Sequence, residues 1–375
     1  MKKTLFAVAA ATALTGAAQA QSSVTVYGIY DGGYLYSNKE FNSSSNVKTI
    51  TTSGSFAGNA SASSRVGFRG MEDLGGGLAA TFNLEIGISP GTGGLTTTSG
   101  TGIGGQSETG IRTSVVGLSH KQWGSVSIGR QLTGIHGVLA GDIWGGNNMV
   151  GDLTYSNFSG TDTGSNTQAG TNGVSTRVHL DAVRANNLLA YTTPNMSGLV
   201  LRADYSNDRA TSISTPGANV GNMGLSGVYT NGPLIIKAAT HKVIANVTVV
   251  TPTTSTINAA SISYKVGDAM VQYTYGSVKQ ESNLGVQTYK YNANKLSANY
   301  KMGNITPFAQ IGLGKSEEAA NTGTADDKGY QVGVEYALSK RSSLYAAYAS
   351  QDRKIQNSNE KVTQTQMAAG LRHTF

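Results

Sequence analysis

Regularly spaced arginines are the residues of this sequence best suited to chemistry, and that chemistry is electrostatic. In the segment 63–72, Arg65 and Arg69 alternate with the apolar residues Val66 and Phe68. This period of two predicts a β-strand with one apolar face and one basic face. Because a guanidinium group stays positively charged at any physiological pH, such a face attracts anions.

Two further arginines join this candidate set. Arg184 stands at the start of another segment with period two, and we expect it on the polar face. Arg130 follows Val126 and Ile128 at even spacing, which places it on the apolar face under strict alternation. It would reach the polar face only if the strand had a bulge at Gly129.

The sequence offers no comparable pattern for catalysis, for a metal or for a cofactor. The five histidines contain no pair at metal-ligand spacing and no catalytic motif with Ser and Asp. Residues 100–105 match a dinucleotide fingerprint formally, but no helical segment follows them. The chain has no cysteine, which excludes disulfides and thiolate sites. We therefore expect no cofactor and no enzyme activity.

The start of the chain has the layout of a secretory signal. Two lysines precede an apolar run at 5–14, which is too short to span a bilayer as a helix. The run ends in small residues, which predicts cleavage between Ala20 and Gln21. We expect residues 1–20 to be removed and residues 21–375 to form one exported domain.

After this signal, polar and apolar residues alternate in about sixteen segments, which is the pattern of β-strands. No uninterrupted apolar stretch of roughly 18 residues is found there, so a membrane-spanning helix is not expected. The segments lie near 24–36, 63–72, 78–88, 112–121, 125–131, 184–193, 199–206, 223–231, 233–243, 258–266, 268–278, 289–301, 303–314, 328–339, 343–351 and 363–375.

The connections between these segments alternate between short and long. The short ones carry mostly Gly, Asn or Pro, as tight turns require, and lie at 74–77, 122–124, 194–198, 231–232, 267, 302–303 and 339–342. The long ones lie at 37–62, 89–111, 132–183, 207–222, 244–257, 279–288, 315–327 and 352–362. This alternation is typical of bacterial outer-membrane barrels, with both chain ends on the short-turn side. It is not expected of a soluble sandwich.

Composition and charge agree with a barrel that has a wet interior. The chain has 49 Gly and 18 Tyr, with 38% hydrophobic residues, which is little for a large buried core. Its net charge of +7 suits anionic solutes or surfaces. Nucleic acid is not expected as a partner, because no basic run of five to eight residues occurs. The last segment keeps its alternation up to Phe375, which predicts that the terminal residue is structural.

These features together resemble the general porin family of Gram-negative bacteria, along essentially the whole mature chain. The motifs that carry the resemblance are Val26-Tyr27-Gly28, Ser64-Arg65-Val66-Gly67-Phe68-Arg69-Gly70-Met71-Glu72-Asp73-Leu74-Gly75, Val116-Gly117-Leu118, Trp123-Gly124, Ile128-Gly129-Arg130-Gln131 and the terminal Phe375. Each motif alone is weak, and their order and spacing together are specific.

The resemblance implies an all-β fold: a sixteen-stranded antiparallel transmembrane β-barrel with short periplasmic turns, long outer loops and a third loop folded into the lumen. The longest connection, 132–183, follows the fifth segment as the family requires. Gly145-Gly146 resembles the turn of the family's constriction loop. Asp142 and Asp152 are the acidic candidates on this loop, where they either face the arginines or lie on a solvated loop surface.

In such a barrel the lipid-facing residues of 63–72 put Arg65 and Arg69 in the lumen, because an outward arginine at mid-bilayer costs about 2–4 kcal/mol. The resemblance assigns Arg65 to the family's basic cluster and supports a pore position for Arg130. The predicted pore constriction consists of Arg65, Arg69, Arg130, Arg184, Asp142 and Asp152.

The expected function is that of an outer-membrane diffusion porin, which passes small hydrophilic solutes and ions with a weak to moderate preference for anions. The resemblance further implies a homotrimer, contact with outer-membrane lipids and lipopolysaccharide, and assembly by the barrel-assembly machinery, with Phe375 as the terminal signal. Three alternatives stay open: a substrate-specific channel for an anionic or sugar solute, an adhesin or structural barrel with a plugged lumen, and a barrel enzyme. A saturable current, an open-channel conductance and a hydrolysis assay would separate them.

Overall fold

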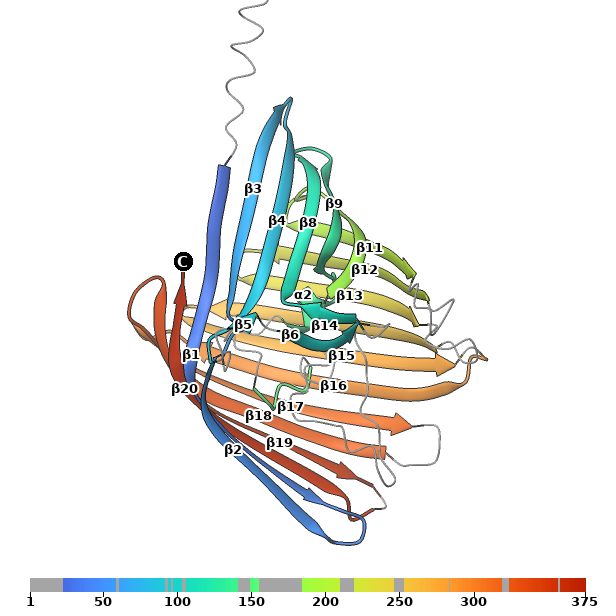
Figure 1. The fold of residues 1–375 in the computed structure, drawn as a ribbon, viewed down its shortest axis with the longest axis vertical. Helices are drawn as coiled ribbons and strands as arrows, with labels where there is room; N and C mark the ends of the chain where they lie inside the picture. Colours follow the sequence, from blue (N-terminus) through green and yellow to red (C-terminus); the bar gives the residue numbers. More distant parts are fainter. Residues whose placement is uncertain are drawn as a thin grey trace, which may run out of the picture.

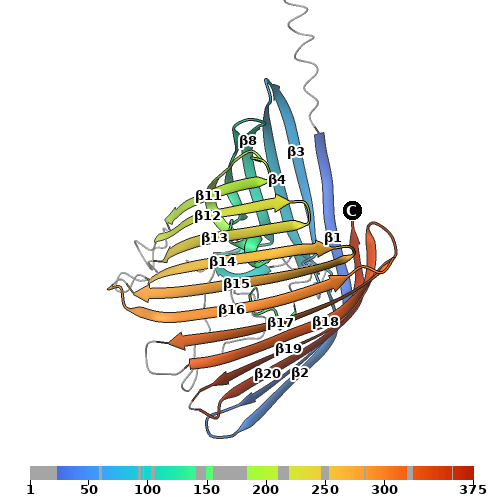
Figure 2. The same ribbon diagram turned by 180° about the vertical axis from the view of Figure 1, so that it is seen from behind.

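The computed structural model of the chain describes residues 23–58, 61–91, 94–95, 97–102, 106–140, 149–154, 184–209, 219–245, 253–282, 284–318, 324–356 and 358–375. Sixteen strands of this part form one antiparallel barrel, which closes where the last strand pairs with the first (Figures 1 and 2). The predicted fold class is therefore confirmed. The barrel strands are β1 (Ser23–Asn42), β3 (Arg65–Gly75), β4 (Leu78–Ser89), β8 (Ile111–His120), β9 (Gly124–Leu132), β10 (Arg184–Thr192), β11 (Leu199–Arg209), β12 (Asn219–Asn231), β13 (Leu234–Ala245), β14 (Thr253–Val266), β15 (Ala269–Ser282), β16 (Gln287–Tyr300), β17 (Ile305–Glu318), β18 (Thr324–Ala337), β19 (Ser342–Ile355) and β20 (Lys361–Thr374).

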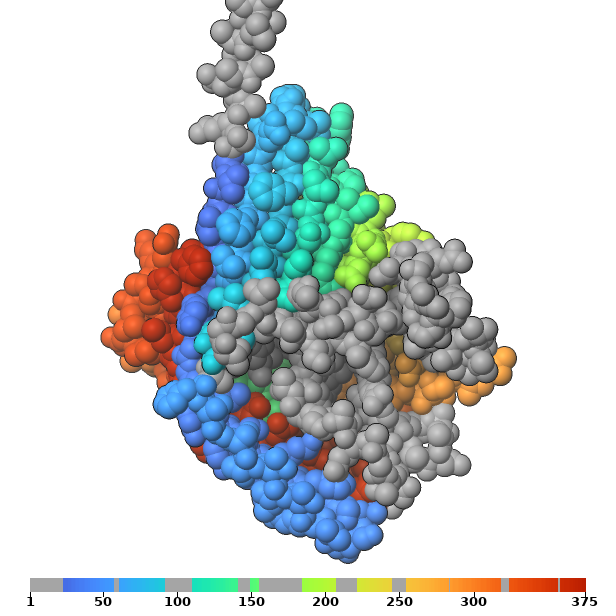
Figure 3. Space-filling model, viewed as in Figure 1, coloured from blue at the N-terminus to red at the C-terminus, as the bar shows by residue number. Residues whose placement is uncertain are grey.

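Each strand separates a lumen face from an outward face by simple alternation. In β16, Tyr291, Lys295 and Ser297 are buried on one face, whereas Leu296 on the other face is exposed. The outward face carries exposed large apolar side chains on nearly every strand, which is the surface that lipid requires. Figure 3 shows β1, β3, β4 and β8 side by side over one face of the molecule.

The alternation of connection lengths is also present. Seven short turns join the strands in pairs at one end of the barrel, and the long connections lie at the other end. Each of the sixteen predicted segments overlaps one barrel strand. Several strands run further into the long-loop end than the sequence pattern indicates, such as β14, which begins at Thr253.

The connection predicted as a loop at 37–62 is largely a β-hairpin, and this part of the prediction is wrong. β1 continues to Asn42, and β2 (Lys48–Gly58) returns antiparallel to it. Residues 37–58 are rich in Ser, Thr and Asn and show no apolar alternation, so the sequence carries no period-two signal there. An ion pair of 2.9 Å between Lys48 and Glu40 spans its two strands.

The remaining described elements lie in the other long connections. They are β5 (Gly94–Leu95), β6 (Thr97–Gly102), β7 (Gln106–Thr109) and the short helix α2 (His136–Leu139). The described residues contain no helix with the length and apolar content needed to cross a bilayer. The expected signal sequence, with its cleavage site between Ala20 and Gln21, lies outside the described residues.

The terminal Phe375 closes the barrel wall. Its backbone amide donates to the Gly28 carbonyl at 3.2 Å, and the Gly28 amide donates to the Phe375 carbonyl at 3.0 Å. The phenyl ring covers Gly28, where a Cβ atom would lie 2.5 Å from the ring. The prediction that the last residue is structural is confirmed.

Candidate functional site

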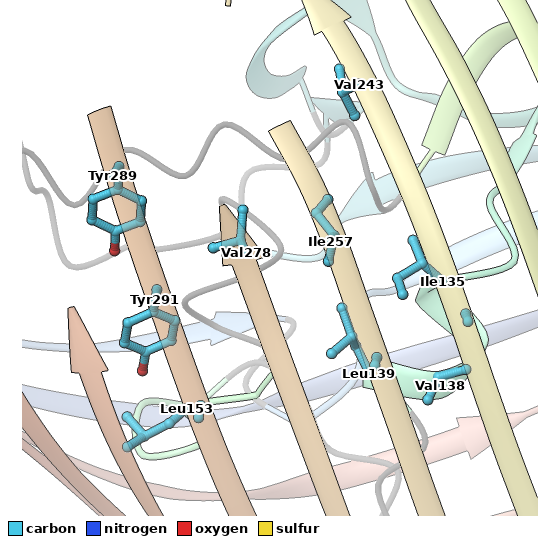
Figure 4. Close-up of a cluster of buried hydrophobic side chains, with 12 residues drawn as sticks. Ile135, Val138, Leu139, Leu153, Val243, Ile257, Val278, Tyr289 and Tyr291 are labelled. Atoms are coloured by element: carbon cyan, nitrogen blue, oxygen red, sulfur yellow. The ribbon is translucent and has the colours of Figure 1, made fainter. Parts of the chain in front are cut away.

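The described parts of the connection 132–183 lie inside the barrel and contact its inner wall. Ile135, Val138 and Leu139, in and beside α2, form a buried cluster with wall residues that include Val243 and Ile257 (Figure 4). The described parts of the third loop therefore lie on the inner wall, and apolar packing holds α2 on β13, β14 and β15.

A second stretch of the same loop, 149–154, is fixed to the adjoining part of the wall, from β16 to β20. The Gln331 side chain donates to the carbonyls of Met149 and Val150 at 3.1 and 2.8 Å. Gly151 has a φ of +94° and lies against Gly329, where a Cβ atom would be 2.5 Å from the Gly151 carbonyl oxygen. Only glycine at both positions allows this close backbone contact.

The carboxylate of Asp152 is not part of the open lumen. It accepts a hydrogen bond from Lys295 Nζ at 2.8 Å, and both side chains have no exposed surface. Neither expectation for Asp152 holds, because it neither faces the arginines nor lies on a solvated surface. Its charge anchors the loop on β16. The other acidic candidate, Asp142, lies outside the described residues.

A cavity of about 430 Å³ lies between this loop and the wall. Loop residues His136 and Ala140 border it from one side. Its described lining carries four arginines and one carboxylate: Arg65, Arg112, Arg184, Arg372 and Glu85. We refer to it as the arginine cavity.

Glu85 is the centre of this charge cluster. Arg112 Nε donates to Glu85 Oε1 at 2.7 Å, and Arg65 Nε lies 3.4 Å from Oε2. A terminal nitrogen of Arg184 lies 3.9 Å from Oε1. One carboxylate therefore faces three guanidinium groups, which leaves an excess of positive charge.

Strand alternation explains the positions of Arg65 and Arg69. The register pairs Arg65 with Gly87 and Arg69 with Asn83, on the face of the inward Glu85. Both arginines thus lie on the lumen face, as predicted. Arg65 lines the arginine cavity, whereas Arg69 lies nearer the short-turn end, with its guanidinium 5.3 Å from the centre of the Tyr27 ring. That distance is typical of a cation–π contact.

Arg112 reaches the cavity through a β-bulge. The register pairs Glu85 with Thr113 and Ile86 with Ile111, so that Arg112 is an extra residue on β8. Strict alternation along β8 would have directed its side chain outward. The bulge instead turns it toward the face of Thr113 and Glu85.

Arg130 lies elsewhere. The β8–β9 register is continuous and pairs Arg130 with Ser114, on the face of the exposed Ile128. The β8–β9 pairing contains no bulge at Gly129, but Gly129 has a φ of +131°, and on the other side of β9 the register with β10 shifts between Ala185 and Leu188, opposite Arg130. Arg130 donates to Asn186 Oδ1 at 2.6 Å and to the Ile111 carbonyl at 2.9 Å. Arg130 is not among the described residues that line the arginine cavity, and its expected place in the pore wall stays a prediction.

Two polar groups complete the cavity wall. Arg372 donates to Glu335 Oε1 at 2.6 Å, so part of its charge is compensated. His136 lies between the loop and the arginines. Burial lowers the pKa of His136 to about 3, and the charges of Arg184 and Arg112 act in the same direction. The imidazole is therefore neutral at physiological pH.

Sequence patterns missed several residues of this site. Glu85 alternates with Leu84 and Ile86, and Arg372 follows Leu371, so alternation alone could have placed both on the lumen face. Arg112 had no such signal, because its position depends on the bulge. His136 lies in the loop, where no period applies. No group of three or more His, Asp or Glu side chains in the described part of the chain could hold a metal ion.

Comparison with known proteins agrees with this architecture. The family model described as Gram-negative porin matches residues 7–356. Outer membrane porin protein 32 of Delftia acidovorans is 31% identical over 93% of this chain and 89% of that protein. The anion-selective porin from Comamonas acidovorans has a TM-score of 0.70 at 24% identity, covering 95% of this chain and all of that one. The trimer form of OmpT from Vibrio cholerae has a TM-score of 0.61 at 15% identity, covering 94% and 99%.

A closed sixteen-stranded barrel with an apolar outer face, an inward loop and a charged lumen is what a passive channel through a membrane needs. The family match spans nearly the entire chain. The chain belongs to the Gram-negative porin family and is an outer-membrane porin.

Proposed function

We propose that the arginine cavity is the constriction of this porin and gives it a weak to moderate preference for anions. The observation that supports this most directly is the charge count of its described lining, where four arginines stand against one carboxylate. The fixed charges next to a narrow path act on passing ions at short distance, where salt screens them poorly. Anions are stabilised in the cavity and cations are repelled.

The loop contacts support a permanent constriction. α2 is packed on one part of the wall, and residues 149–154 are hydrogen-bonded to another. The buried pair Asp152 and Lys295 adds a link whose separation would leave an unpaired charge in a buried site. These contacts hold the described parts of the loop in place inside the barrel, next to the arginines.

We infer that the porin acts as a homotrimer, like the trimer form of OmpT. This inference rests on the likeness to that structure. In the same proposal residues 1–20 are removed, residues 21–375 form one domain without enzyme activity, Phe375 serves as the assembly signal, and the barrel contacts outer-membrane lipids and lipopolysaccharide.

A zero-current potential across a planar bilayer tests the anion preference. With single channels in a tenfold KCl gradient, the sign of the potential should correspond to chloride as the more permeant ion. Arg65→Glu should shift the potential toward cation preference. A wild-type potential of the cation-selective sign, or an Arg65→Glu potential equal to that of the wild type, would reject the proposal.

A substrate-specific channel is the second candidate, because guanidinium groups gathered around one cavity can also bind a particular anion. The two functions differ in how the current depends on concentration. A general channel gives a conductance for an organic anion that rises without saturation. Saturation at millimolar concentration, with block of the chloride current, would favour the specific channel.

A further inference from the structure

Three lysines occupy the lumen face of the barrel between the loop and the periplasmic turns. They are Lys237 on β13, Lys265 at the end of β14 and Lys301 directly after β16. We propose that these residues form a basic track along which small anions pass between the arginine cavity and the periplasmic mouth. This inference rests on the proposed anion preference and adds a second group of residues to it.

Strand alternation places the lysines in the lumen. On β14, Ile257, Ala259, Ser261 and Ser263 are buried at every second position, and Lys265 is the next residue of that series. Its neighbours Tyr264 and Val266 are exposed on the outward face.

The same argument applies to β16 and β13. Ser297 is buried two residues before Asn299, and Lys301 continues that face beyond the strand end. On β13, Ala239 and His241 are buried, and Lys237 precedes them on the same face. All three ammonium groups therefore lie on the water-filled side of the wall.

The spacing of the lysines suits a continuous path. β13, β14, β15 and β16 are neighbours in the wall (Figure 2), and the register opposes Lys265 to Met270, which in turn opposes Asn299. Lys301 is thus two strands away from Lys265 and two residues further along. With strands about 4.8 Å apart and a rise of about 3.4 Å per residue, their Cα atoms are about 12 Å apart. At low salt the fields of such charges overlap, because the Debye length is about 30 Å at 0.01 M.

Lys237 connects this path to the constriction. Its ammonium donates to the Gly137 carbonyl of α2 at 3.2 Å. The adjacent residue of the helix, His136, lines the arginine cavity. An anion that leaves the cavity past α2 therefore meets Lys237, then Lys265, then Lys301.

Within the described residues, Lys265 and Lys301 lack the carboxylate partners that several other lumen charges have. Arg353 lies 3.6 Å from Asp327 near the outer end, and Lys295 is paired with Asp152. Within the described part of the chain, no ion pair includes Lys265 or Lys301. Their side chains are exposed, so they act by raising the local anion concentration and do not bind one solute tightly.

Salt dependence separates this track from the constriction. At 1 M salt the Debye length is about 3 Å, which removes the effect of exposed lysines on the ion population. The arginine cavity is narrow and holds its charges close to the ions, so its selectivity persists there. Variants in which these lysines are neutralised should therefore have the wild-type conductance at high salt and a reduced conductance at low salt.

The test uses the full-length porin with Lys265→Gln and Lys301→Gln combined, leaving Lys237 in place because it also holds α2. Single-channel conductance in KCl should be about half of the wild-type value at 0.01 M and equal to it at 1 M. The control combines Lys242→Gln and Lys354→Gln, which removes the same charge from exposed, outward-facing positions nearer the outer end. The control should match the wild type at both salt concentrations.

Each outcome decides the matter. Equal conductance of the lysine variant and the wild type at 0.01 M overturns the track, and so does an equal loss in the control. A loss that persists unchanged at 1 M would show altered pore structure and also overturns it. If the wild-type channel itself shows no anion preference in the gradient experiment, the proposed constriction fails, whatever the lysine variants do. Lys265→Glu with Lys301→Glu should lower the low-salt chloride conductance further.

Discussion

Replacement of Arg112 by Gln is the sharpest test of the arginine cavity, because this residue reaches the lumen only through the bulge of β8. Arg112 Nε is 2.7 Å from Glu85 Oε1, and the side chain is 14% exposed. The substitution removes one of the four positive charges of the lining and keeps a polar side chain that can still contact Glu85. The surrounding wall should retain its fold.

Coulomb's law gives the expected size of the effect. A monovalent ion about 6 Å from a unit charge in a water-like dielectric has an interaction energy of about 0.7 kcal/mol. This energy corresponds to about a threefold change in the local anion concentration. Cations gain what anions lose, so the ratio of anion to cation permeability falls by up to about tenfold. The substitution also removes the shortest ion-pair contact of Glu85. The negative charge of Glu85 is then less compensated, which lowers the anion preference further.

The assay is the zero-current potential of single channels in a tenfold KCl gradient, with Arg130→Gln as the matched control. Both substitutions remove one arginine from adjacent strands, but Arg130 is not among the described residues that line the arginine cavity. Migration on a denaturing gel before and after heating shows that both variants keep their assembly. Arg112→Gln should shift the potential toward zero, and Arg130→Gln should leave it unchanged. An equal shift in both variants, or none in Arg112→Gln, would refute the placement of these side chains.

Two further predictions concern the loop. Asp152→Asn leaves the ammonium of Lys295 without a countercharge in a fully buried site, so the free energy of unfolding measured by urea titration in detergent should fall by about 3–5 kcal/mol. Combining Asp152→Leu with Lys295→Met should recover much of that loss, and an unchanged Asp152→Asn protein would contradict the anchoring role. His136→Asn should have the same selectivity as the wild type at pH 7 and pH 5. The imidazole takes up a proton only as the pH falls toward its pKa of about 3, so a gain of anion preference at pH 5 in the wild type alone would disprove this assignment.

The barrel was readable from the sequence because its signals are local. Alternation within ten residues shows which face of a strand meets lipid, and Gly, Asn or Pro marks each tight turn. Arg65 was found in this way, and Arg184 also lines the cavity, although a register shift separates it from the rest of β10. Glu85 and Arg372 were accessible to the same reasoning. Phe375 also followed from local alternation, since its pattern continues to the chain end.

Other features depend on contacts between distant parts of the chain. The pairing of Asp152 with Lys295 joins positions 143 residues apart, and no local pattern indicates it. The β1–β2 hairpin lacks apolar alternation, and only the pairing of its two strands reveals it. The bulge at Arg112 and the irregularity in β10 are settled by the register of neighbouring strands, and a single extra residue reverses the direction of a side chain.

The sequence by itself thus determined that this chain forms a sixteen-stranded porin barrel, because strand period and turn chemistry act over a few residues. Only the tertiary structure decided which charges meet in the lumen. The register brings Arg112 into the arginine cavity and loop packing makes Asp152 an anchor, and both outcomes depend on contacts across the whole barrel.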